Sequence, residues 1–139
     1  MITKDYFKRT FKARDKICEA QERIEQLQED MISVKRSSLS GINVQTSPGH
    51  DPLGDTIARI LDKIRECEEV IAFWQGIRMD IEDLIDSIEH DVYRRVLRER
   101  YVKLKDWDTI AESNAYSKAH VYDLHKKGLA MVKMPEKPD

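Results

Sequence analysis

A chain of 139 residues has room for one ordinary domain, or for one elongated element and a small module. Charged residues make up 36% of it, whereas glycine and proline together number only nine. This composition favours solvent-facing helices over a compact sheet protein, so we predict an all-α fold. No stretch approaches 18 consecutive apolar residues, and no apolar N-terminal segment follows a basic start. We therefore expect a cytoplasmic protein without a membrane partner.

The net charge of −2 hides an uneven distribution along the chain. Residues 1–36 carry a net charge of +2, residues 55–91 a net of −7 and residues 92–137 a net of +5. An average near zero would argue against nucleic acid as a partner, but a basic C-terminal segment keeps nucleic acid among the candidates.

The first segment, residues 1–36, is predicted to form one long helix, because it contains neither glycine nor proline from about Thr3 onward. Its apolar residues recur at alternating steps of three and four, the heptad pattern of a helix packed along another helix. These residues are Ile17, Ala20, Ile24, Leu27, Met31 and Val34.

Residues 37–54 are predicted to be a flexible loop, since these 18 residues include three Gly, two Pro and four Ser. A second long helix is expected over residues 55–90, with Asp55 as its cap. It has its own heptad stripe, which consists of Ile57, Ile60, Ile64, Cys67, Ile71 and Trp74, and then continues through Ile77, Ile81, Leu84 or Ile85, and Ile88. Two helices of similar length joined by one loop predict an antiparallel hairpin.

Several apolar residues lie off these stripes, and a lone hairpin would leave them in water. They are Ile32, Leu61, Val70 and Phe73. We therefore expect a homodimer formed through residues 3–36 and 55–88.

The two cysteines, Cys18 and Cys67, form no C-x-x-C pair and are expected to be buried thiols.

The acidic run between residues 80 and 91 has the density of a metal site, but it lacks the Glu-x-x-His step of a di-iron bundle. A solvated acidic face explains it better. We find no pattern that predicts catalytic residues, a metal or a cofactor, and we do not expect an enzyme.

In residues 91–134 the apolar residues no longer follow the heptad spacing of the two long helices. A helix is expected to start at His90 and Asp91 and to carry an arginine cluster over residues 94–100, which could face DNA or pair with the acidic run. Asp106 and Ser117 can cap two further short helices. A short helix, a tight turn and a second helix form the plan of a helix-turn-helix, whose second helix enters a major groove. Its predicted core consists of Trp107, Ile110, Ala111, Val121 and Leu124.

The stretch from Tyr93 to Val132 resembles the region-4 helix-turn-helix of bacterial sigma factors. The residues that carry the resemblance are Arg98, Arg100, Tyr101, Ile110, Ala111, Glu112, Ser117, Val121 and Leu129. The whole layout resembles small phage and prophage late transcription regulators of the ArpU/RinA-like type. This resemblance implies sequence-specific binding of duplex DNA in the cytoplasm of a bacterial host, with RNA polymerase as a further candidate partner.

The turn departs from that family's pattern. The family places glycine where this chain has Ala115, and an apolar residue where it has Asn114. Because asparagine tolerates the left-handed backbone conformation better than alanine, the turn is expected to shift by one residue.

The predicted DNA contacts lie on the second helix, with Lys118, Tyr122 and Lys126 as an outward stripe. Further contacts are expected from Ser117, Ala119, His120 and Lys127, and phosphate contacts from Lys103 and Lys105. Plainer roles stay open for some of them. Lys126, Lys127 and Lys133 suit the end of a helix, Tyr122 could edge the dimer interface, and His125 is expected to be a packing residue.

Two other functions remain open at this point. A small terminase-like packaging protein also joins a helix-turn-helix to oligomerising helices, and a coiled-coil adaptor could use the C-terminal segment to bind protein. Assembly of many copies into a ring would favour the packaging protein, and the absence of DNA binding would favour the adaptor.

Residues 135–139 are expected to form a disordered tail.

Overall fold

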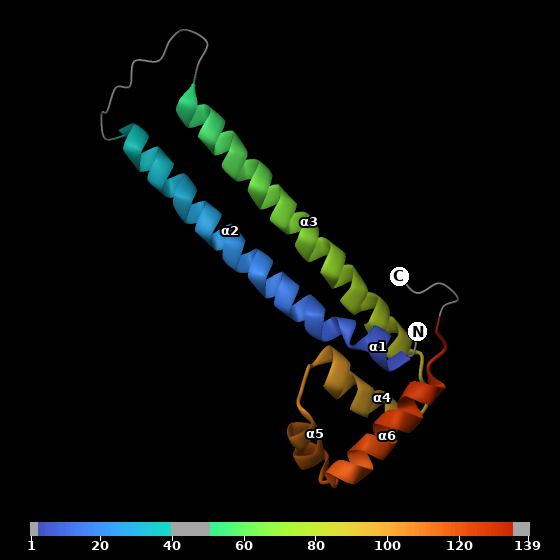
Figure 1. Ribbon diagram of the computed structural model, residues 1–139. Coiled ribbons are helices and arrows are strands. Elements are labelled where there is room, and N and C mark those ends of the chain that lie inside the picture. Colours follow the sequence, from blue (N-terminus) through green and yellow to red (C-terminus); the bar gives the residue numbers. More distant parts are fainter. Residues whose placement is uncertain (1–2, 40–50, 135–139) are drawn as a thin grey trace. The chain divides into compact units, whose positions relative to one another are not determined.

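The computed structural model describes residues 3–39 and 51–134, and all regular structure in these two ranges is helical (Figure 1). The prediction of an all-α protein is therefore confirmed. The predicted tail at 135–139 and residues 40–50 of the predicted loop lie outside the described residues. The elements are α1 (Thr3–Phe7), α2 (Arg9–Leu39), α3 (Pro52–Asp86), α4 (Asp91–Leu97), a π-helical turn η1 (Arg98–Val102), α5 (Trp107–Asn114) and α6 (Lys118–Met131).

The helix ends differ from the predicted ones at several places, and α3 ends at Asp86 rather than at residue 90. A break at Lys8 divides the first predicted helix into α1 and α2. Helix α2 then continues to Leu39, and α3 already begins at Pro52, so both ends of the predicted loop at 37–54 are helical. The expected cap Asp55 lies inside α3, whereas the Asp51 carboxylate accepts a hydrogen bond from the Gly54 N–H at 3.0 Å. Asp51 followed by proline is a favourable helix start, because proline at the first position loses no hydrogen bond.

The chain forms two compact units, residues 16–73 and residues 1–15 together with 74–139. This division differs from the predicted boundary at residue 91, because the N-terminal residues and the end of α3 pack with the C-terminal helices. Each unit is described by itself below.

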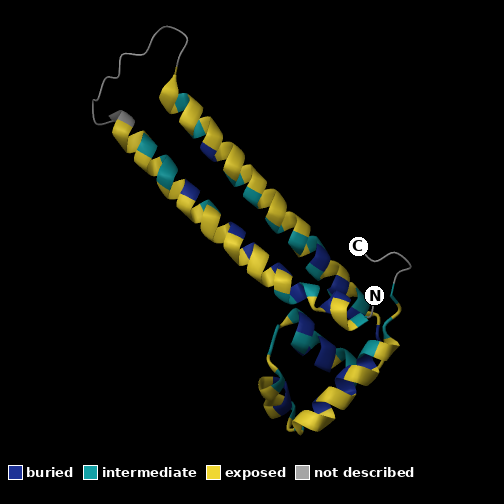
Figure 2. Ribbon diagram, in the orientation of Figure 1, coloured by how far each residue is buried: buried dark blue, intermediate teal, exposed yellow. Residues whose placement is uncertain are grey.

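In the unit of residues 16–73, the predicted heptad residues of α2 and α3 are buried or half-buried, whereas most other positions are exposed (Figure 2). The expectation of two buried thiols is wrong: Cys18 is exposed, on the side of α2 away from its stripe, and Cys67 is half-buried. Four large apolar residues off the stripes are exposed by 42–59%, namely Ile32, Leu61, Val70 and Phe73.

The larger apolar core of the other unit contains residues from both ends of the sequence. From α1 come Tyr6 and Phe7, and from the last part of α3 come three isoleucines at helical spacing, followed by Ile88 just beyond the helix. Their partners from α4 and η1 are Leu97 and Tyr101. The C-terminal helices therefore bury part of their surface against α1 and the end of α3. The buried members of this core are Tyr6, Phe7, Ile77, Ile81, Ile85, Ile88, Leu97 and Tyr101.

The turn between α5 and α6 is formed by Ala115 itself, which has φ 57° and ψ 39° in the left-handed region. The predicted shift of the turn onto Asn114 is wrong. Asn114 stays helical because its Nδ2 donates hydrogen bonds to the Ile110 carbonyl and to Glu99 Oε2, each at 2.8 Å. The amide therefore holds the end of α5, and the left-handed position falls on the next residue.

This geometry makes Ala115→Gly a stabilising substitution. Glycine removes the steric penalty of the Cβ at positive φ, and part of that gain is offset by the greater freedom of the unfolded chain. We expect the free energy of unfolding to rise by about 0.5–1 kcal/mol, measured by urea denaturation. As a control, Ala58→Gly at an exposed position inside α3 is expected to lower it by about 1 kcal/mol. Equal effects of the two substitutions would contradict the assignment of the turn.

Candidate nucleic-acid interface

Helices α5 and α6 both begin at a side-chain cap. The Asp106 carboxylate accepts a hydrogen bond from the Thr109 N–H at 2.7 Å, and this bond holds the pKa of Asp106 below its usual value. Ser117 Oγ accepts a hydrogen bond from the His120 N–H at 3.1 Å. Such caps satisfy backbone donors that a helix start leaves unpaired, so both helices have defined first residues.

A small apolar cluster holds α4, α5 and α6 together. Val96 of α4, Ile110 of α5 and Val121 of α6 are fully buried in it, and Trp107 packs against them half-buried. All five residues predicted to form the core of the helix pair therefore contribute to one cluster, which consists of Val96, Ile110, Ala111, Val121 and Leu124 with Trp107 at its side.

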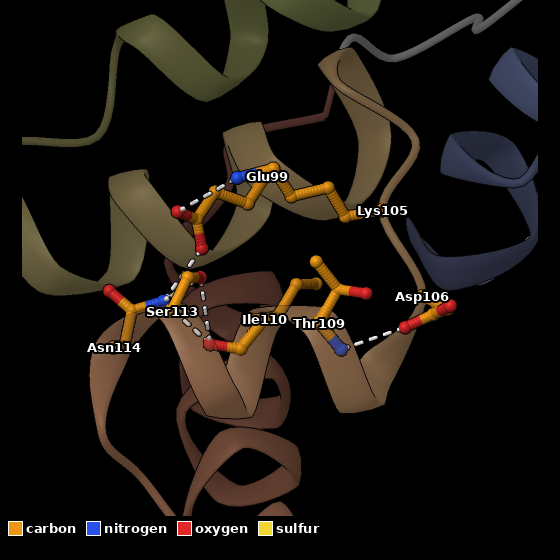
Figure 3. Close-up of polar contacts among 7 residues, drawn as sticks. All are labelled: Glu99, Lys105, Asp106, Thr109, Ile110, Ser113 and Asn114. Carbon is orange, nitrogen blue, oxygen red and sulfur yellow. Dashed lines mark hydrogen bonds and ion pairs between the residues drawn. The ribbon is translucent and has the colours of Figure 1, made fainter.

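A buried carboxylate links η1 to the end of α5 (Figure 3). Glu99 is 8% exposed and accepts a hydrogen bond from Asn114 Nδ2, and the Lys105 ammonium lies 3.6 Å from its other oxygen. Burying a charge is costly unless it is paired, and these two partners supply the pairing. Lys105 was predicted to contact phosphate, but its ammonium group pairs with Glu99. Lys103, the other predicted phosphate contact, is exposed.

The outward side of α6 carries the predicted DNA-contact residues. With Val121 and Leu124 buried, the opposite side of the helix is exposed, and Tyr122 is 45% exposed with its edge against the Trp107 ring. The predicted residues that are exposed on or just before this helix are Ser117, Lys118, Ala119, His120, Tyr122, Lys126 and Lys127.

Two of these lysines are paired at the surface. The Lys118 ammonium lies 2.8 Å from the Asp108 carboxylate, and Lys127 lies 2.9 Å from Asp123. Each carboxylate raises the pKa of its lysine, so both lysines keep their charge at neutral pH. Exposed pairs of this kind are weak, so a phosphate can replace the carboxylate at small cost. Asp123 was not among the predicted residues, although it lies on the same outward side.

His125 is a packing residue, as the sequence indicates. Its side chain is 6% exposed, and its Nε2 forms a 2.7 Å hydrogen bond with the Tyr101 hydroxyl. Burial, with the nearby charges of Lys4 and Arg100, lowers the pKa of His125 to about 4, so the ring is neutral near pH 7. Burial also raises the pKa of Tyr101 to about 12. The pair therefore joins α6 to η1 as two neutral groups.

Most arginines of the cluster at residues 94–100 form ion pairs or hydrogen bonds with other residues of the protein. Arg98 lies 2.6 Å from Asp86 and 3.2 Å from Glu82, so it pairs with the acidic end of α3. Arg94 donates to the Ile88 carbonyl at 2.7 Å, and Arg95 donates to the Tyr116 hydroxyl at 3.2 Å. Of the two roles left open by the sequence, pairing with the acidic run is the one that these contacts favour.

Gly128 is a close-packing position that was not predicted from the sequence. A Cβ built on it would lie 3.2 Å from Leu97 Cδ1 and 3.4 Å from the Tyr93 Cβ. Glycine therefore allows α6 to lie close against α4 and fixes the position of the outward stripe. A lone glycine inside a helical pattern is a signal of such close packing.

The described residues contain no cluster of three or more His, Cys, Asp or Glu side chains placed to hold a metal ion. Among the same residues, no helix combines the length and the apolarity needed to span a bilayer. Comparisons with protein-family models, with curated proteins and with solved structures find no match for this chain.

Proposed function

We propose that the protein binds duplex DNA through a helix-turn-helix formed by α5 and α6, and that α2 and α3 form an antiparallel hairpin through which two copies associate. In this proposal α6 is the recognition helix. The resemblance of residues 93–132 to sigma-factor region 4 supports a role in transcription regulation in a bacterial cell, and RNA polymerase is a proposed further partner.

The observation that carries the proposal is the exposed stripe of Lys118, Tyr122 and Lys126 on a helix whose other side is fixed. Buried side chains and caps hold both α5 and α6, so the stripe is presented on a rigid element. Lysine can contact guanine or phosphate, and an aromatic ring can pack on a thymine methyl group. These are the residue types that a recognition helix uses.

The charge of residues 92–137, a net of +5, provides a non-specific attraction to the DNA backbone. Six phosphate contacts per dimer correspond to a log–log salt slope of about −5 and a non-specific dissociation constant of about 10⁻⁴ to 10⁻⁶ M. One helix pair contacts few base pairs, so a useful affinity needs a second copy on a two-fold-related site. The exposed apolar residues of the unit at 16–73 provide a surface for that second copy.

Fluorescence anisotropy with labelled duplex DNA tests the proposal. Lys118→Ala combined with Tyr122→Ala is expected to weaken binding on the order of tenfold or more and to reduce the salt slope by about 1 per bound protomer. Both side chains are exposed, so circular dichroism should show unchanged helix content. Lys63→Ala, at an exposed position of α3, is the charge-matched control and is expected to have little effect.

Two outcomes would contradict the proposal. If the double variant binds DNA as tightly as the wild type at every salt concentration, α6 is not the recognition helix. If the wild type does not bind duplex DNA at 50 mM salt, a coiled-coil adaptor that binds protein becomes the better hypothesis, and the exposed apolar side chains of the unit at 16–73 favour it.

A further inference from the structure

Two adjoining grooves lie in the unit that contains both ends of the described chain, and the larger one lies beside α6. The larger, with a volume of about 1000 Å³, is lined by α1, the start of α5 and one flank of α6, including Tyr122, His125 and Lys126. The smaller, of about 380 Å³, is lined by Lys8, Phe11, Arg100 and Tyr101 among others. Lys4 and Trp107 line both, so the two grooves form one continuous surface. We call this surface the α1 groove.

The α1 groove is positively charged. Four cationic side chains line it, and none of the described residues that line it is acidic, although the chain as a whole has more acidic than basic residues. His125, also in the lining, is neutral near pH 7 because burial lowers its pKa to about 4. The charge of Arg100 is one of the causes that lower the pKa of Asp106, whose carboxylate already caps α5. The four cationic residues are Lys4, Lys8, Arg100 and Lys126.

Lys4 of α1 and Lys8, which lies between α1 and α2, hold two of these charges one turn apart. A backbone hydrogen bond from the Lys8 N–H to the Lys4 carbonyl joins them, so both lie on the same side of this turn. Tyr6 and Phe7 are buried in the core and fix the position of that side. Both lysines are exposed, and like charges at this spacing repel each other. An anion between them would remove that repulsion.

Arg100 lines the smaller groove, and contacts with its neighbours hold its side chain in place. The Arg100 guanidinium lies between the rings of Phe11 and Trp107, 4.6 and 4.3 Å from their centroids, and its Nη1 donates to the Lys105 carbonyl. Its Nε is buried and has no partner among the described residues. Arginine held between aromatic rings keeps its charge and its geometry, which suits binding of a phosphate.

We propose that the α1 groove binds phosphate groups of the DNA backbone, with Lys4 and Lys8 as the contacting cations. The inference rests on the proposed function, because the ligand is the DNA that α6 binds. Continuity favours this source of phosphate over a free anion: Tyr122 and Lys126 belong both to the outward stripe of α6 and to the groove lining. A DNA strand that contacts the stripe can therefore continue along α1. The interface is then larger than the helix-turn-helix and includes the N-terminal segment.

The test compares the salt dependence of DNA binding in two charge-matched variants of the full chain. Lys4→Ala with Lys8→Ala is expected to reduce the log–log slope by about 2 per bound protomer and to weaken binding on the order of tenfold per lysine at 50 mM salt. The loss should be similar for all DNA sequences, because phosphate contacts carry no base information. The control, Lys35→Ala with Lys63→Ala, removes two exposed lysines of the other unit and should leave the slope near that of the wild type.

A second arm separates DNA phosphate from a free anion. Inorganic phosphate is titrated at constant ionic strength while tryptophan fluorescence is followed, since Trp107 lines the groove. We expect no saturable change below about 1 mM, because a single phosphate lacks the linked charges of a backbone. Saturation below that concentration, lost in Lys4→Ala with Lys8→Ala while the DNA slope stays unchanged, would assign the groove to a small anion and overturn the proposal.

The remaining outcomes distinguish this inference from the proposed function. If the wild type binds DNA, and Lys118→Ala with Tyr122→Ala weakens binding while Lys4→Ala with Lys8→Ala does not, the groove inference alone is wrong. If the wild type does not bind duplex DNA, both are wrong.

Discussion

Replacing Tyr101 with alanine is expected to lower the free energy of unfolding of its unit by about 3–5 kcal/mol. The ring is 2% exposed and lies edge-on to Phe7 and Phe11, with centroid distances of 5.2 and 6.2 Å. Its hydroxyl is the hydrogen-bond partner of the buried His125. The substitution leaves a cavity where α1, η1 and α6 meet and an unpaired ring nitrogen. Urea denaturation followed by circular dichroism measures the loss.

Tyr101→Phe is the matched control, because it keeps the ring and removes only the hydroxyl. The expected cost is about 1–2 kcal/mol, the cost of one buried hydrogen bond whose other partner remains. A Tyr101→Ala protein within about 1 kcal/mol of the wild type would contradict the central place of this ring in the core.

Acidification is expected to destabilise the same unit between pH 6.5 and pH 4. The pKa of His125 is about 4 in the folded protein and about 6.5 when the ring is in water, so the unfolded chain binds a proton that the folded one excludes. The stabilisation is complete above pH 6.5 and is lost as the pH falls towards 4. The total change is roughly 3 kcal/mol, measured as the free energy of unfolding at a series of pH values.

His125→Gln tests the origin of this pH dependence. Glutamine is neutral throughout and can still bond to the Tyr101 hydroxyl, so the loss of stability between pH 6.5 and 4 should largely disappear in this variant. Asp106, whose pKa lies below its usual value, loses its contribution only at lower pH and does not interfere. If wild type and variant show the same slope across this range, another group is responsible.

The fold class and most of the helix starts were predictable from sequence because their signals are local. A stripe at steps of three and four identified Leu27 and Ile60 as buried. Asp106 and Ser117 were recognisable caps, since capping involves neighbouring residues only. The spacing of apolar residues predicts which residues form the stripe, but it does not predict whether a residue next to the stripe is covered by another part of the protein. For this reason the exposure of Cys18 was not predicted.

The parts that were not predicted depend on contacts between residues far apart in the sequence. Asn114 keeps its helical conformation through Glu99, so a propensity argument about Asn114 and Ala115 alone placed the turn on the wrong residue. Lys105 has its partner in the same buried carboxylate, and Arg98 has its partners in α3. The α1 groove was missed for the same reason, since Lys4 and Lys126 belong to opposite ends of the chain and only the folded core brings them to one surface.

The core shared by Phe7 and Tyr101 has a consequence for biosynthesis. During translation, Tyr6 and Phe7 leave the ribosome long before η1 and α6 exist, so these rings cannot yet make their core contacts with the C-terminal helices. Contacts that span so much sequence form late, because a long segment must first be closed into a loop. The nascent protein therefore passes through a stage in which its N-terminal aromatic side chains are available to a chaperone or to another unfinished copy.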